Sequence, residues 1–134
     1  MVTIETAMEG QVYTIYYKEE DGLVFMDWDG YATSEQFRAG SELMLQLVQE
    51  HKTSKVLADA KDMILIGLED QQWVVNEIFP KLIDAGCKTM ALVSPHHYFN
   101  KVAIESLSFK ANEKSLSCRI FHNLKAANEW LDTV

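Results

Sequence analysis

The sequence predicts an α/β fold: a mixed five-stranded sheet with four helices, in the order β-β-α-β-α-β-α-β-α. Three short apolar runs, centred on residues 56–57, 91–92 and 120–121, are separated by segments with helical periodicity. This pattern is typical of parallel strands joined by right-handed crossovers. Before them, residues 11–29 hold two strand-like segments around a turn, which predicts an antiparallel hairpin.

The first half of the chain predicts the hairpin and one helix. Aromatic and β-branched residues favour strands at 11–18 and 23–29, and Glu20-Asp21-Gly22 between them is a turn signal. Thr33 and Gln36 have the spacing of a capping box, so a helix should begin there and run to about residue 50. Gly40 lies on the apolar stripe of this helix, which indicates a close approach to the sheet.

The second half predicts three strands that alternate with three helices. The strands are expected at 55–60, 88–94 and 117–122, and the helices at 69–85, 100–110 and 124–131. Pro80 must kink or divide the helix at 69–85, because proline has no N–H to donate to Asn76. Gly86 is expected to end that helix, and Asn123 is a good N-cap for the last one.

Length and composition indicate a single domain over residues 1–134. The chain has 134 residues, of which 48% are hydrophobic, and a net charge of -8. Residues 1–50 carry 10 acidic and 2 basic side chains, whereas the rest is neutral. This acidic balance disfavours nucleic-acid binding. The acidic part is either a solvated face or a docking surface for a basic partner.

The sequence also bears on location. It has no apolar run of the roughly 20 residues that span a bilayer, and its N-terminus does not have the pattern of a signal peptide. Its two cysteines, Cys87 and Cys118, do not make a disulfide framework. We therefore expect a cytoplasmic protein with free thiols.

Several local strings resemble STAS domains, the SpoIIAA-like family of anti-sigma factor antagonists, and above all small stand-alone bacterial members. They are Lys55-Val56-Leu57-Ala58-Asp59-Ala60, Glu69-Asp70 with Trp73, residues 86–93 and residues 126–131. The resemblance implies a non-enzymatic regulatory or interaction module with a protein partner. In antagonists, a serine after the third strand is phosphorylated, and the added charge breaks docking. Residues 59–70 contain no Ser, Thr or Tyr, so the resemblance does not carry this phosphorylation site over.

Polar side chains are expected at the carboxyl ends of the strands, where ligands of open α/β sheets gather. They are Asp59, Asp62, Ser94, His96, His97 and His122. Their types suit metal binding or acid–base chemistry, but their spacing matches no motif. We therefore assign no metal, no cofactor and no catalytic residue, and treat these positions as a candidate binding site. Its apolar candidates are Met63, Ile64, Leu65, Ile66 and Trp73, for which core packing is the alternative.

Three further possibilities stay open. Because STAS-like folds resemble SEC14-like lipid-binding domains, a small apolar ligand is expected beneath residues 63–68 if a dry cavity lies there. An enzyme is the third functional option. A weak homodimer is expected to form through the neutral part of the chain, near residues 63–80, and to survive low salt.

Overall fold

Six strands form one mixed sheet in the computed structural model, which describes residues 4–6 and 12–134. The strands lie in chain order: β1 (Ile4–Thr6), β2 (Tyr13–Lys18), β3 (Leu23–Gly30), β4 (Lys55–Met63), β5 (Thr89–Val93) and β6 (Ser117–Phe121). β1, β2 and β3 pair antiparallel, and β3 to β6 pair parallel. The predicted mixed sheet is confirmed, and the short β1 adds a strand to the five expected. The predicted start of the hairpin at Gln11 lies outside the described residues.

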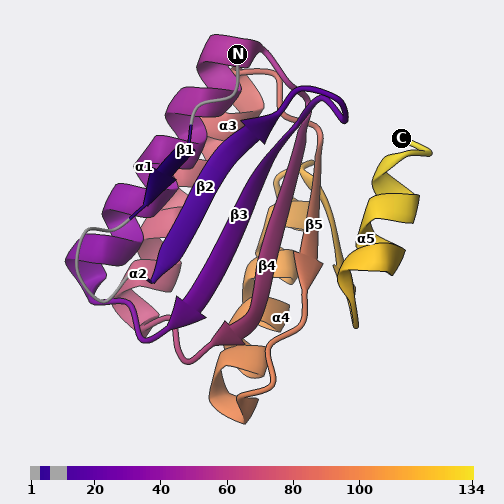
Figure 1. Cartoon of the computed structure of the whole chain (residues 1–134). Helices are drawn as coiled ribbons and strands as arrows, with labels where there is room; N and C mark the ends of the chain where they lie inside the picture. Colours follow the sequence, from indigo (N-terminus) through magenta and orange to yellow (C-terminus); the bar gives the residue numbers. More distant parts are fainter. Residues whose placement is uncertain (1–3, 7–11) are drawn as a thin grey trace.

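Four helical segments cover the two faces of the sheet unequally. They are α1 (Ser34–His51), the continuous run α2 (Leu68–Trp73), η1 (Val74–Ile78) and α3 (Phe79–Asp84), then α4 (Tyr98–Glu113) and α5 (Leu124–Leu131). The first three segments pack on one face and enclose the main core. α5 packs a smaller core on the other face against β4 to β6 (Figure 1). We call this second face the open face, because Asp27 and Asp29 on it are exposed.

α1 begins and packs as the sequence predicts. The backbone N–H of Thr33 donates to Gln36 Oε1 at 2.9 Å, and the N–H of Gln36 donates to Thr33 Oγ1 at 3.1 Å, so the capping box is formed. A Cβ placed on Gly40 would lie 2.6 Å from Cη2 of Trp28. Because no side chain fits there, Gly40 lets α1 approach β3 closely, as expected.

A π-helical turn lies just before Pro80, inside a helical run that stays continuous. The N–H of Phe79 donates to the carbonyl of Val74, five residues earlier, and α3 then begins with Pro80 in its first turn. A π turn commonly absorbs a local break in the α-helical ladder. Gly86, with φ of +99°, ends α3 as predicted, whereas at Pro80 the run is not divided and a π turn interrupts its α-helical ladder.

Several predicted boundaries are shifted by one to three residues. β4 continues to Met63 instead of ending at residue 60, because a bulge separates the pairs Asp27–Asp59 and Asp29–Asp62. The N–H of Lys61 donates to Asp59 Oδ1 at 3.0 Å within this bulge. The connecting loop therefore spans only residues 64–67. α4 begins at Tyr98 instead of residue 100, and β6 ends at Phe121, before His122.

Both cysteines are buried free thiols, as expected. Burial raises the pKa of Cys87 to about 12 and that of Cys118 to about 11, so neither is a thiolate near neutral pH. Among the described residues, no helix is both long enough and apolar enough to cross a membrane.

Candidate functional site

Three chain segments meet at the carboxyl ends of the parallel strands. The N–H of Ile64 donates to the carbonyl of Gly30 at 3.1 Å, which joins the end of β4 to that of β3. The N–H of His96 donates to the carbonyl of Lys61 at 3.0 Å and joins the segment before α4 to β4. These bonds make residues 30–31, 61–66 and 96–100 one end of the molecule, the lower end in Figure 1.

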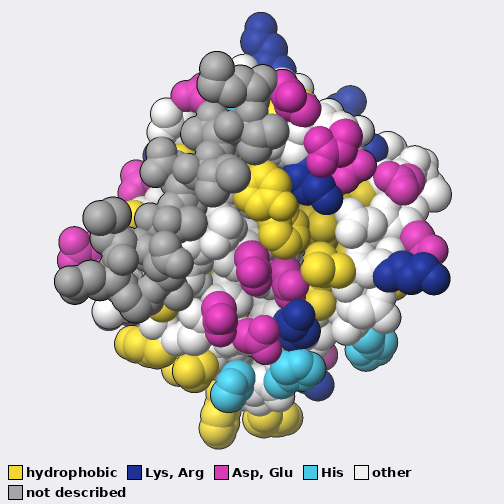
Figure 2. Space-filling model, viewed as in Figure 1, with side chains coloured by type: hydrophobic (Ala, Val, Ile, Leu, Met, Phe, Trp, Pro, Cys, Tyr) yellow, Lys and Arg dark blue, Asp and Glu magenta, His cyan; other side chains and the backbone are white. Residues whose placement is uncertain are grey.

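Large apolar side chains are exposed at this end. We call the following set the apolar end surface: Tyr31, Ile64, Leu65, Leu68, Tyr98, Phe99 and Val102. Leu68, Tyr98 and Phe99 are 69%, 70% and 76% exposed, and the two rings contact each other edge to face at 5.6 Å. Figure 2 shows hydrophobic side chains gathered at the lower end, close to histidines. Large apolar side chains exposed together at one end of a molecule are typical of an interaction site.

Four carboxylates lie beside the apolar end surface on the open face of the sheet. Asp27 and Asp29 on β3 pair in register with Asp59 and Asp62 on β4, and Lys61 lies among them. Figure 2 shows this group of acidic side chains at the centre of the open face. Asp59 is buried, and its Oδ2 lies 3.9 Å from Nζ of Lys61.

The electrostatics of this carboxylate group act on Asp27. Desolvation on the sheet face raises the pKa of Asp27, and the charge of Asp59 raises it further. Asp29 and Asp62 add smaller effects in the same direction, while Lys61 lowers the pKa. The open face therefore holds uncompensated negative charge, which suits a basic side chain from a partner.

A cavity of about 70 Å³ lies in the main core, between the sheet and the helices. All four methionines between residues 12 and 134 line it: Met26, Met44, Met63 and Met90. Ser41 is the one residue with a polar side chain among its lining residues. A lining this apolar favours an apolar occupant over water.

The wall of the cavity and the apolar end surface share one short segment. Met63 and Ile66 point inward and line the cavity, whereas Ile64 and Leu65 between them are exposed. The fully buried amide of Asn100 holds this segment, because its Oδ1 accepts from Ile66 N–H at 2.9 Å and its Nδ2 donates to Met63 O at 3.3 Å.

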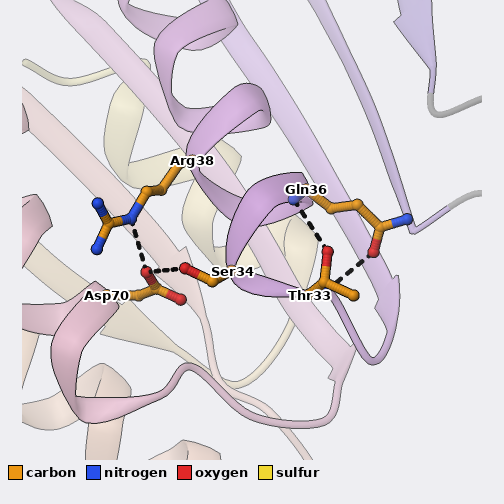
Figure 3. A network of polar contacts seen from close by, with 5 residues as sticks. All are labelled: Thr33, Ser34, Gln36, Arg38 and Asp70. Atoms are coloured by element: carbon orange, nitrogen blue, oxygen red, sulfur yellow. Dashed lines mark hydrogen bonds and ion pairs between the residues drawn. The ribbon is translucent and has the colours of Figure 1, made fainter.

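A polar network fixes the helix that follows this segment. Arg38 Nε donates to Asp70 Oδ1 at 2.9 Å, and Ser34 Oγ donates to the same oxygen at 2.7 Å (Figure 3). The Arg38 guanidinium also lies over the ring of Trp73, 5.0 Å from its centroid. These contacts join the start of α1 to α2, so α2 is held against the core next to the cavity.

The predicted site residues fall into separate environments. Asp62, Ile64, Leu65, His96 and His97 are exposed at the carboxyl end of the sheet, where the sequence predicts a site. In contrast, three others are buried: Met63 and Ile66 line the cavity, and Asp59 lies inside β4 on the sheet. The site predicted from sequence is thus divided between a surface and a cavity.

The remaining predicted residues are not part of the apolar end surface. Trp73 is half-buried in α2 and contacts Arg38 and Phe37. Ser94 is half-buried, and its N–H donates to Phe121 O at 2.8 Å, which joins β5 to β6. His122 is exposed just after β6. Within residues 4–6 and 12–134, no three His, Cys, Asp or Glu side chains are grouped so as to hold a metal ion.

Sequence reasoning missed three features of this end of the molecule. The aromatic pair Tyr98-Phe99 was not included, although two adjacent aromatic residues after Pro95 are a visible signal. Asp27 and Asp29 were not included, because only the parallel register brings them beside Asp59. Asn100 was placed at a helix start, and no local pattern indicates that it is buried.

Comparison with known proteins supports the fold assignment. No family model and no curated protein matches the sequence. An uncharacterized protein of the DUF3478 family with a SpoIIAA-like fold, from Shewanella loihica PV-4, matches with a TM-score of 0.56 and 17% identity. The match covers 98% of this chain and 92% of that one. An anti-sigma factor antagonist from Mycobacterium paratuberculosis matches with a TM-score of 0.60 and 10% identity, over 98% and 95% of the two chains. The chain therefore has a SpoIIAA-like fold, as its sequence resemblance implied.

Proposed function

We propose that this chain is a non-enzymatic regulatory module that binds a protein partner through the apolar end surface. The observation that carries the proposal is the exposure of Leu68, Tyr98 and Phe99, which are each about 70% accessible. Burying such side chains is favourable by roughly 25 cal/mol per Å² of apolar surface, so a partner gains most there.

The charges beside this surface define the chemistry of the partner. Asp29 and Asp62 precede the exposed Tyr31 and Ile64 along β3 and β4, so negative charge borders the apolar side chains. We therefore expect a partner segment with apolar residues flanked by Lys or Arg. An anti-sigma factor antagonist among the structural neighbours is in line with a protein partner. Because residues 59–70 contain no hydroxyl side chain, phosphorylation there does not control docking.

Phe99→Ser tests the proposal, and Phe109→Ser is its matched control. Both rings are exposed on α4, at 76% and 65%, but only Phe99 belongs to the apolar end surface. A partner captured from the native cytoplasm should be lost with Phe99→Ser and kept with Phe109→Ser. The same difference should appear with the two purified proteins. Equal binding by both variants would contradict the proposal.

A second copy of this chain is the competing occupant of the surface. Light scattering at low and at physiological salt measures it. If the protein forms a dimer and Phe99→Ser abolishes it, the apolar end surface binds a second copy of this chain instead of a different protein. If the protein is a monomer at both salt concentrations, the result supports a different protein as the partner of this surface.

A second candidate function is the binding of a small apolar molecule in the core cavity. The observation that favours it is the position of the cavity directly beneath Met63 and Ile66, with a lining that is almost wholly apolar. A saturable rise in the unfolding temperature with xenon pressure would support it. No change in unfolding temperature with xenon would contradict it.

A further inference from the structure

The cavity restricts the chemical class of its ligand and the route by which that ligand arrives. We infer that it binds a compact, uncharged apolar molecule of about one ring, which passes beneath residues 64–67. This inference rests on the second candidate function and adds the ligand class and the route. It is independent of the protein partner.

The size of the cavity limits the ligand. Its volume of about 70 Å³ is under half that of an engineered apolar cavity of about 150 Å³ that binds benzene or xenon. Methionine side chains are unbranched and change rotamers readily, so the four that line the cavity allow it to widen for one ring. An extended acyl chain needs far more space than this.

The polarity of the cavity limits the ligand further. Ser41 is its one polar side chain, and no Asp, Glu, Lys, Arg or His is among the lining residues. A carboxylate or phosphate inside would lose its hydration without a countercharge, which is highly unfavourable. The ligand is therefore uncharged, with at most one hydroxyl or carbonyl for Ser41 to bond.

The loop 64–67, which contributes Ile66 to the lining, is the part of the wall that opens most readily. The other lining residues belong to strands or helices, whose backbone groups are bonded in continuous ladders. Single bonds hold this loop and its ends. The Asn100 amide bonds to Ile66 N–H and to Met63 O, and Ile64 N–H donates to Gly30 O. Gln71 donates twice, from Nε2 to Ile66 O at 2.8 Å and from its backbone N–H to Gly67 O at 2.9 Å. Moving this loop uncovers the cavity toward the apolar end surface.

Iodobenzene is a suitable probe, because its heavy atom quenches tryptophan fluorescence and Trp28 lines the cavity. We expect saturable quenching in the intact protein. Ala60→Leu fills the cavity with a larger side chain and should abolish the saturable quenching. Ala39→Leu, on the exposed side of α1, should keep it. If Ala60→Leu does not fold, Ser41→Leu fills the cavity from α1 instead.

Competition separates the ligand class from the site itself. Dodecanoate should not displace iodobenzene. Displacement by dodecanoate would contradict the inference that the ligand is compact and uncharged, but it would still support binding in the cavity. If Ala60→Leu or Ser41→Leu folds and still shows saturable quenching, iodobenzene binds outside the cavity and the inference is wrong. An absence of saturable quenching by iodobenzene, together with no response to xenon, would overturn the second candidate function as well.

Stopped-flow mixing tests the route. Asn100→Ala should speed the association of iodobenzene by a factor of about 5–30, because two bonds that close the loop are lost. Gln71→Met removes one bond and should give a smaller increase. If Asn100→Ala does not fold, Gln71→Met alone decides. Wild-type association rates in the folded variants would overturn the route.

Discussion

Arg38 on α1 donates to Asp70 on α2 at 2.9 Å, across 32 residues of sequence. The Asp70 side chain is only 10% exposed and also accepts from Ser34, so one carboxylate satisfies donors from two turns of α1. This pair fixes the helical segment that covers the cavity.

Asp70→Ala should lower the free energy of unfolding by about 1–3 kcal/mol, because it removes two hydrogen bonds to a charged group. Arg38 is 39% exposed and keeps contact with water, so the loss stays below that of a fully buried pair. Glu77→Ala is the control, since its pair with Lys81 spans 3.8 Å on the surface. That variant should change stability by less than about 1 kcal/mol. Urea unfolding measures both, and equal losses would contradict the prediction.

Gly40→Ala should destabilise the protein by about 1–3 kcal/mol, although alanine is the better helix former. Its Cβ would lie 2.6 Å from Trp28 Cη2 and 3.3 Å from Ile15 Cδ1. Gly67→Ala is the matched control, because nothing lies within 4 Å of a Cβ there. Thermal unfolding should show a clear loss for the first variant and a shift of less than about 1 kcal/mol for the second. A stabilising Gly40→Ala would show that Trp28 moves freely.

Asn100→Ala should speed amide hydrogen exchange at residues 64–67 before any other part of the core. The variant leaves the Ile66 N–H and the Met63 carbonyl without their side-chain partner. Asn112→Ala is the control, because that amide bonds to Ser108 and Cys118 at the other end of α4. Its faster exchange should appear at Cys118 instead. Uniform acceleration in both variants would mean global unfolding and would contradict a local role.

Asp27→Asn should stabilise the protein at neutral pH and have little effect near pH 3. The pKa of Asp27 is raised in the folded state, mainly by desolvation and then by Asp59. The folded protein then binds its proton more tightly than the unfolded chain, so stability falls as pH rises from the unfolded pKa of about 3.9 through the folded value. The amide removes this loss. Unfolding temperatures from pH 3 to pH 7 measure the difference, with Asp84→Asn, which lies outside the carboxylate group, as the control. A constant difference across this range would contradict the assignment.

The sequence by itself determined the fold class, because its signals are local and periodic. The capping box at Thr33 and Gln36, the missing N–H of Pro80 and the apolar runs at residues 56–57 and 91–92 each specify nearby backbone structure. Such signals depend on neighbours a few residues apart, and together they predict a SpoIIAA-like order of strands and helices.

Tertiary structure decided the candidate site. Met63 and Ile66 enter the core while Ile64 and Leu65 face solvent, and an apolar run in sequence does not reveal which way each residue points. Asp27 meets Asp59 only through the register of parallel strands, and Asn100 reaches residues 63–66 only because the start of α4 lies against the end of β4. These relations join residues more than 30 positions apart. They depend on how whole elements pack, which no local pattern of residues specifies.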